Sequence, residues 1–245
     1  MRRFTLLLLL LSGVAAADDE VLTVAVASNF LNTAEVIASR YTEDYGAPVR
    51  LVSGSTGKLY AQIVNGAPYD VFLAADDERP RLLESAGLTL DAQRLTYANG
   101  QLWLFSSGQT FPSGNCHDAL VNGEFRKLAI ANPATAPYGR AAMEYLESLG
   151  LADTYRPRLV YGESVSQVTH FVISGNAELG IGKPASVQGG CLAPARDGNY
   201  SAIRQQAVVL ARTEYPQAAA DFLDFLKQPE IRGIIVDDGY LTESQ

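Results

Sequence analysis

The stretch Val52-Ser53-Gly54-Ser55-Thr56-Gly57-Lys58-Leu59 decides how we interpret this sequence. The apolar residues 49–52, at its start, have the character of a buried strand. From Gly57 the apolar side chains recur at helical spacing until Gly66, which predicts a helix over 57–65. The stretch is therefore a junction where a strand ends in small hydroxyl residues and a helix begins.

Such a junction can bind an anion. The first N–H groups of a helix have no partner within the helix, and the helix dipole places about +0.5 of an elementary charge there. Three other junctions share the arrangement: Ser28-Asn29, Pro137-Tyr138-Gly139 and Ser164-Val165. Each one alone is most often a plain helix cap, so the prediction of a ligand site depends on all four lying together.

Short apolar segments alternate with helical patterns along most of the chain. This alternation is typical of doubly wound α/β sheets, in which ligands bind at the carboxyl ends of the strands. Residues 183–200 are expected to be irregular, and helices are expected at 140–149 and 165–174. The predicted strands are residues 22–27, 49–52, 70–75, 97–106, 128–131, 159–161, 179–182 and 207–210.

The pattern changes at about residue 99 and then repeats in style, which predicts two α/β lobes joined by two hinge crossings. Lobe one comprises residues 18–98 and 205–245, and lobe two, residues 99–204, is inserted into it. Two of the four junctions belong to each lobe. We therefore expect a hinged clamshell whose ligand cleft lies between the lobes, with hydrogen-bond donors on both walls.

Residues 1–17 are predicted to be a signal peptide. Arg2 and Arg3 precede an apolar run, and Ala15-Ala16-Ala17 offers small residues for cleavage before Asp18. The apolar run is too short to span a bilayer, and no cysteine follows it that could carry a lipid. We therefore expect export of a soluble mature chain.

Charge and cysteine content narrow the classes of partner. The formal net charge is −8, and loss of Arg2 and Arg3 makes it more negative, which argues against nucleic acid and anionic lipid. The two cysteines, Cys116 and Cys191, are an even number in an exported protein, which is consistent with one disulfide. Two free thiols are the alternative. With only two histidines, a zinc site is not expected.

Five segments carry motifs of a known family: Val26 to Asn29, Ser53 to Ile63, Gly66 to Asp76, Asn132 to Gly139, and Gly162 to Val165. With the C-terminal helix they cover nearly the whole mature chain in the family's order. The chain resembles the periplasmic molybdate-binding proteins, which have the type II solute-binding fold and are receptors of molybdate ABC transporters. The resemblance implies a monomeric periplasmic protein, not an enzyme and without a cofactor, that delivers molybdate or tungstate to a membrane permease and its cytoplasmic ATPase.

The resemblance also implies which groups hold the ligand. The family binds the tetrahedral oxyanion through hydroxyls and main-chain N–H groups, so molybdenum enters only as the oxyanion, with no direct protein ligand. Which of Ser55 and Thr56 makes the closer contact is left open. Carried onto this sequence, the contacts are Ser28, Asn29, Ser55, Thr56, Tyr138 and the main-chain N–H of Val165.

One segment departs from the family pattern. Some members have a ligand-contacting tyrosine where this chain has Gly182-Lys183-Pro184-Ala185, whereas others carry it in the earlier loop, as Tyr138 is placed here. Lys183 has two interpretations: a solvated loop residue, or a cation at the rim of the cleft that alters affinity or anion choice. Asp70 and Asp76 are interpreted as structural.

Three other functions are compatible with parts of the sequence. A hydrolase with Ser55 as nucleophile needs a base, but His117 lies in a polar loop, His170 on a helix, and no Gly-x-Ser-x-Gly elbow is present. A binding protein for sulfate or phosphate would share the fold. A site made only of donors rejects a ligand that must itself donate a proton. Sulfate and molybdate can be separated only by the size of the cavity. In an interaction protein with no ligand, the hydroxyl residues at the junctions would be only helix caps.

Overall fold

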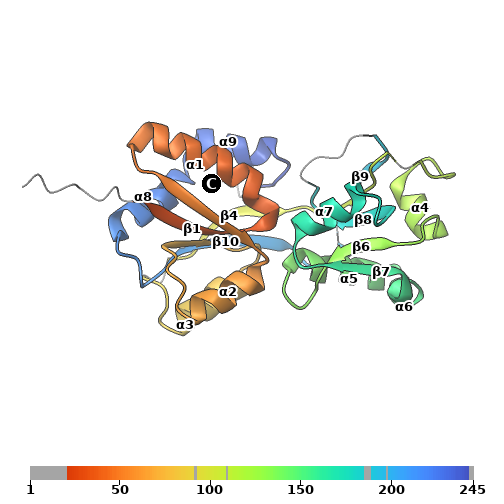
Figure 1. The fold of residues 1–245 in the computed structure, drawn as a ribbon, viewed down its shortest axis with the longest axis horizontal. Coiled ribbons are helices and arrows are strands. Elements are labelled where there is room, and N and C mark those ends of the chain that lie inside the picture. The colour runs from red at the N-terminus through yellow and green to blue at the C-terminus, as the bar shows by residue number, and fades with distance from the viewer. Residues whose placement is uncertain (1–20, 91–92, 109, 185–188, 197, 243–245) are drawn as a thin grey trace, which may run out of the picture.

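The computed structural model describes residues 21–90, 93–108, 110–184, 189–196 and 198–242 of the chain. Two α/β bodies lie side by side (Figure 1), and each is built on a five-stranded sheet. The predicted fold class, two α/β lobes joined by two crossings, is therefore confirmed. The predicted signal peptide, residues 1–17, lies outside the described residues.

Lobe one contains the sheet with strand order β2-β1-β3-β10-β4. Strand β1 is an interior strand, and it runs parallel to β2 and to β3. Strand β10 runs antiparallel to β3 and β4, since it carries the chain back from lobe two. The elements of lobe one are β1 (Leu22–Ala27), the 3-10 helix η1 (Ser28–Phe30), α1 (Leu31–Tyr45), β2 (Val49–Gly54), α2 (Thr56–Val64), β3 (Val71–Leu73), α3 (Glu78–Ser85), β4 (Leu95–Gly100), β10 (Ile203–Val209), α8 (Pro216–Phe225) and α9 (Pro229–Asp237).

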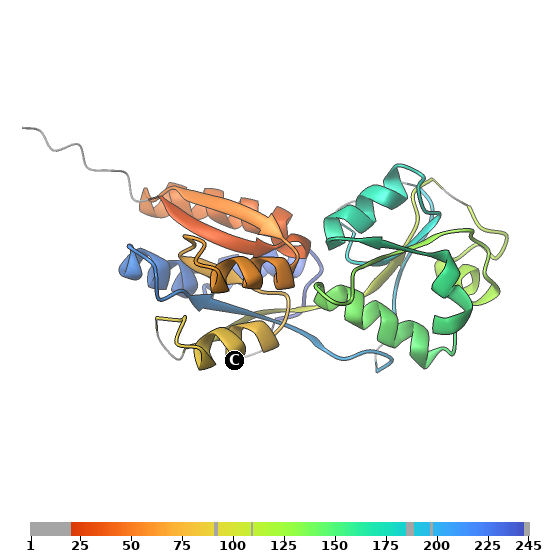
Figure 2. The ribbon, with the colours of Figure 1, turned by 60° about the horizontal axis from the view of Figure 1, so that its bottom comes forward.

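Helices cover both faces of this sheet (Figure 2), which explains why β1 has no polar side. Val24 and Val26 belong to the core formed with α1, α8 and α9, whereas Ala25 belongs to the core formed with α2 and α3. A strand that alternates between two dry layers must be apolar at every position. The continuous apolar run 24–27 records this burial, and Thr23 is only partly buried.

Lobe two repeats the plan with strand order β7-β6-β8-β5-β9. Strand β6 is parallel to β7 and β8, and β5 is antiparallel to β8 and β9. A disulfide between Cys116 and Cys191, whose Cα atoms are 5.6 Å apart, ties α4 to the segment before β9. The elements of lobe two are β5 (Trp103–Phe105), α4 (Cys116–Asn122), β6 (Leu128–Ala131), α5 (Pro137–Ser148), α6 (Ala152–Tyr155), the 3-10 helix η2 (Arg156–Arg158), β7 (Leu159–Gly162), α7 (Val165–Ile173), β8 (Leu179–Gly182) and β9 (Leu192–Pro194).

The prediction of one long strand over 97–106 was wrong. The segment consists of β4 and β5, which belong to different sheets, and the chain crosses between the lobes at Gln101 and Leu102. Asn99, Gly100 and Gln101 do interrupt the apolar pattern at the crossing, and Asn-Gly is a turn signal that the prediction passed over. The prediction that 183–200 is irregular was also wrong at β9, and α5 begins at Pro137, three residues before the predicted start, because proline is well suited to the first helical position.

The two crossings are neighbours. Ile203, at the start of β10, pairs with Gly100, at the end of β4, so both connections between the lobes run through one place. Within the part of the chain that the structure describes, no helix has both the length and the apolar character needed to cross a membrane.

The disulfide closes a loop with a sequence separation of 75 residues. We expect replacement of both cysteines by serine to lower the free energy of unfolding by about 2–4 kcal/mol, because the crosslink limits the conformations of the unfolded chain. Urea unfolding measures the loss. The parent chain in reductant should show the same loss and the double variant no further change; equal stability of parent and variant without reductant would contradict the prediction.

Candidate oxyanion-binding site

The six residues predicted to contact a ligand line one cavity at the meeting of the two lobes. The space open to the centre of a water-sized sphere is about 10 Å³, far below the roughly 300–1,000 Å³ of pockets that hold drug-sized molecules. Helix α2 begins on one wall, and helices α5 and α7 begin on the other. The lining residues are Ala27, Ser28, Asn29, Gly54, Ser55, Thr56, Ala75, Ala136, Pro137, Tyr138 and Val165.

The cavity offers neutral donors rather than charged side chains. Among the described residues, its lining contains no Lys, Arg, Asp or Glu. The amino ends of α2, α5 and α7 supply N–H groups and partial positive charge at the same place. The arrangement therefore suits one small anion that accepts hydrogen bonds on all sides.

Helix capping does not account for the hydroxyl residues at this cavity. Ser55 is the N-cap residue of α2, yet its side chain makes no cap hydrogen bond. The N-cap residue of α5 is Ala136, which has no polar side chain. Only the fourth junction has a true cap, because the Ser164 side chain accepts from the N–H of Gln167 at 3.3 Å. The Ser55 hydroxyl is thus available for a ligand.

Thr56 differs from its neighbour. It is 1% exposed, and its Oγ1 accepts a hydrogen bond from the N–H of Ala75 at 3.1 Å, which joins the start of α2 to the end of β3. The hydroxyl keeps one proton to donate, but this bond restricts where that proton can point. Ser55, with no cap bond to its side chain, has the less restricted hydroxyl of the two.

Asn29 can offer the cavity only its main-chain N–H. Its side-chain Nδ2 donates one hydrogen to Gln205 Oε1 at 2.8 Å and the other to the hydroxyl of Tyr240 at 3.1 Å. An amide nitrogen has two hydrogens, so none is left, and the remaining Oδ1 is an acceptor that an anion repels.

Tyr138 is a buried donor. The residue is 1% exposed, and burial raises the pKa of its hydroxyl well above the ordinary value, so the group stays protonated. The hydroxyl makes no hydrogen bond within the described part of the chain, although the Asn29 side chain lies close enough to oppose the rise of its pKa. An unsatisfied buried hydroxyl costs about 1–3 kcal/mol. An acceptor in the cavity would supply the missing partner.

Lys183 does not belong to the cavity lining. It is 7% exposed, so its interpretation as a solvated loop residue was wrong. Its Nζ forms an ion pair with Asp238 at 2.8 Å and lies 4.6 Å from the centre of the Tyr240 ring. It is also not among the lining residues, so the structure does not place it at the cavity rim. Lys183 instead joins the end of β8 in lobe two to the residue after α9 in lobe one, because a buried ammonium needs a partner.

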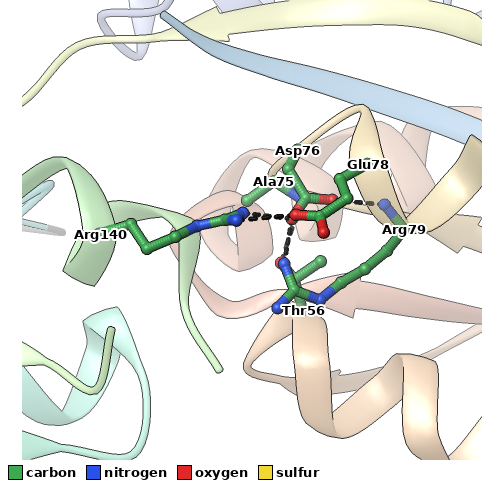
Figure 3. A network of polar contacts seen from close by, with 6 residues as sticks. All are labelled: Thr56, Ala75, Asp76, Glu78, Arg79 and Arg140. Carbon is green, nitrogen blue, oxygen red and sulfur yellow. Dashed lines mark hydrogen bonds and ion pairs between the residues drawn. The ribbon is translucent and has the colours of Figure 1, made fainter. Parts of the chain in front are cut away.

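Other polar contacts hold the lobes together around the cavity. Arg140 on α5 binds Asp76 at 3.2 Å and Glu78 at 2.7 Å, both on lobe one (Figure 3). Arg79 also binds Asp76. Burial raises the pKa of Asp76, and the guanidinium groups of Arg79 and Arg140 oppose this rise. The structural interpretation of Asp76 agrees with these contacts, which sequence reasoning did not predict.

The remaining candidates have structural partners as well. The Asp70 carboxylate accepts from the N–H of Thr23 and the hydroxyl of Thr213, each at 2.7 Å. His117 contacts the Pro194 carbonyl at 2.9 Å and the Tyr145 hydroxyl at 3.2 Å. The cavity lining includes neither histidine, so the structure does not pair Ser55 with a general base there.

The Ser55 side chain separates a ligand role from a capping role. We expect Ser55→Ala to weaken molybdate binding about tenfold or more, because a hydrogen bond to an ion is lost. Its free energy of unfolding should change by less than about 0.5 kcal/mol, whereas Ser164→Ala, which removes a true cap, should lose about 1 kcal/mol. Calorimetric titration and urea unfolding measure the two effects; a loss of stability in Ser55→Ala equal to that in Ser164→Ala would support capping.

Gly57 lets the lobes approach each other. Its N–H donates to the Thr135 carbonyl of lobe two at 2.8 Å, and a Cβ at this position would lie 2.9 Å from that oxygen. We expect Gly57→Ala to weaken molybdate binding at least tenfold, because the added methyl group obstructs the closed arrangement. The control is Gly233→Ala in α9, where a Cβ meets nothing within 4 Å and binding should be unchanged. Equal affinities of the two variants would contradict the prediction.

Known proteins resemble this chain over most of its length. A family model described as bacterial extracellular solute-binding protein matches residues 22–241. The molybdate-binding protein ModA of Azotobacter vinelandii is 41% identical over 231 residues, covering 92% of this chain and 91% of that protein. The molybdate-binding protein ModA of Rhodobacter capsulatus is 39% identical over 241 residues, covering 96% and 94%.

The fold agrees with these sequence matches. The solved structure of the Azotobacter vinelandii periplasmic molybdate-binding protein matches with a TM-score of 0.84 and 37% identity, covering 91% of this chain and 100% of that one. Two lobes, a cavity at their meeting and a family match over nearly all described residues lead to one conclusion: this chain belongs to the bacterial extracellular solute-binding proteins.

Proposed function

We propose that this protein captures molybdate between its lobes in the periplasm and delivers it to an ABC importer. The observation that carries the proposal is the small cavity of neutral donors, among them the buried and unpartnered Tyr138 hydroxyl. The two relatives named as molybdate-binding proteins support the choice of anion. Tungstate, an oxyanion of the same shape and charge, is proposed as a second ligand.

The proposed contacts come from both lobes. Ser28, Ser55 and Thr56 donate hydroxyl protons from lobe one, together with the N–H of Asn29, and Tyr138 and the N–H of Val165 donate from lobe two. Each hydrogen bond to an ion contributes about 1.5–3 kcal/mol. Several such bonds can reach the roughly −8 kcal/mol of micromolar binding after the costs of association are met. The molybdenum atom itself needs no protein ligand.

The proposed mechanism is capture by closure. We assign residues 18–100 and 203–245 to lobe one and the residues between them to lobe two, two residues from each predicted boundary because β4 ends at Gly100 and β10 begins at Ile203. The hinge lies at the paired ends of β4 and β10. A ligand that bonds to both lobes stabilises the closed arrangement, in which Gly57 and Arg140 also reach across. The closed monomer, exported with loss of residues 1–17, then docks on a membrane permease coupled to an ATPase. It carries out no catalysis and needs no cofactor.

Isothermal titration of the mature protein with molybdate, tungstate, sulfate and phosphate tests this proposal. We expect one-to-one binding of molybdate and tungstate and no heat from sulfate or phosphate. Tyr138→Phe should bind molybdate about 10- to 100-fold more weakly, because the variant lacks a buried donor to a charged ligand.

Each other outcome has a meaning. Binding of sulfate or phosphate without molybdate would keep the site and discard the proposed ligand. Silence for all four anions would discard the site. Unchanged affinity in Tyr138→Phe would remove Tyr138 from the contacts.

A further inference from the structure

Gln205 is a buried polar residue that has appeared so far only as the acceptor of one Asn29 hydrogen. It lies on β10, next to the hinge, and is 0% exposed. Its Oε1 accepts a hydrogen bond from Asn29 Nδ2 at 2.8 Å and lies 3.3 Å from the Tyr97 hydroxyl, whose single proton also faces the Ala74 carbonyl at 3.0 Å. One end of its amide is thus joined to a residue that lines the cavity.

The main-chain carbonyl of Asn29 determines which atom donates and which accepts in these hydrogen bonds. The main-chain carbonyl of Asn29 can only accept, so the Tyr240 hydroxyl, 2.6 Å away, donates its single proton to it. The Tyr240 oxygen must then accept, and it does so from Asn29 Nδ2 at 3.1 Å. Because the second hydrogen of that nitrogen points to Gln205, the oxygen end of the Gln205 amide has to face Asn29.

The nitrogen end of the same amide lies near the Tyr138 hydroxyl, although no hydrogen bond joins the two groups. Gln205 Nε2 lies 3.2 Å, and the Tyr138 hydroxyl oxygen 2.3 Å, from the point that a Cβ at Gly100 would occupy. Within the described residues neither atom has a hydrogen-bond partner. The two groups share a small buried space that exists because residue 100 has no side chain.

We infer that Gln205 is a positioning residue that keeps the Tyr138 hydroxyl a donor to the ligand. An amide nitrogen carries only hydrogens and cannot accept the phenolic proton. That proton is therefore left for an acceptor in the cavity. With the amide reversed, its oxygen would take the proton, and the Tyr138 oxygen would turn its lone pairs toward the anion.

This role deepens the proposed function and rests on it. A site whose donors cannot become acceptors favours a fully ionised oxyanion over one that carries a proton to donate. Gln205 thereby contributes to the selection of molybdate over hydrogen phosphate without touching either ion.

The test is a double-mutant cycle of Gln205→Glu and Tyr138→Phe, with molybdate affinity as the readout. Q205E keeps an oxygen for Asn29 and Tyr97 but replaces the N–H groups by an oxygen that accepts the Tyr138 proton. We expect Q205E to weaken binding at least 100-fold in the parent and less than tenfold in the Y138F background, where the added charge alone acts. Equal losses in the two backgrounds would overturn the inference.

A second variant separates positioning from simple support of Asn29. Gln205→Met removes the acceptor of Asn29 but offers Tyr138 no acceptor, so we expect a loss below tenfold, smaller than that of Q205E. If Gln205 serves only to hold Asn29, Q205M should be the weaker binder, and this order would overturn the inference. Q205M also carries the test if Q205E does not fold: a loss above 100-fold would assign Gln205 to Asn29.

The neighbouring residue supplies a matched control. Gln206 is also buried on β10, and its Nε2 donates to Thr96 Oγ1 at 3.1 Å. Gln206→Glu and Gln206→Met make the same changes of charge and volume on the same strand and should bind molybdate within twofold of the parent. If the parent itself does not bind molybdate, the proposed function fails; if it binds and the cycle is additive, only the role of Gln205 fails.

Discussion

The structure depends on hydrogen-bond donors that the protein itself leaves unsatisfied. A cavity without charged side chains can attract an anion only if its N–H and O–H groups are not already paired. Such groups are costly in a protein interior, so they must be few, and the surrounding packing must offset their cost. Tyr138 and Ser55 meet this requirement in different ways: one hydroxyl is buried without a partner, and the other is a helix N-cap residue that does not cap. The two sheets bring these groups to one place.

Much of this arrangement could be predicted from the sequence, because the signals for it lie in short local segments. Continuous apolar runs, as at residues 24–27, indicate strands that are buried on both faces. Small hydroxyl residues before a helical pattern, as at Ser55, indicate the junctions. These signals lie within a few neighbouring residues. The six proposed contacts could therefore be chosen before the fold was known, and the structure brings them to one cavity.

The features that sequence reasoning missed depend on partners far away in the chain. Asn29 is bound to Gln205, so its side chain cannot serve the ligand, and Lys183 is paired with Asp238 rather than solvated. No local pattern records either partner. The break between β4 and β5 was missed despite the local turn signal Asn99-Gly100. The hydrophobic pattern also does not show which sheet buries each strand.

The insertion of lobe two has a consequence for the order of folding. Strand β10 completes the first sheet by pairing with both β3 and β4, yet it follows the whole of lobe two in the chain. Synthesis starts at the amino end, so one edge of β3 stays uncovered until all of lobe two has been made. Lobe two is one continuous segment with its own core and can become compact first. Lobe one must wait with an open strand edge, a state from which chains aggregate. The same topology that brings both hinge strands together thus makes lobe one the vulnerable part of the molecule during its biogenesis.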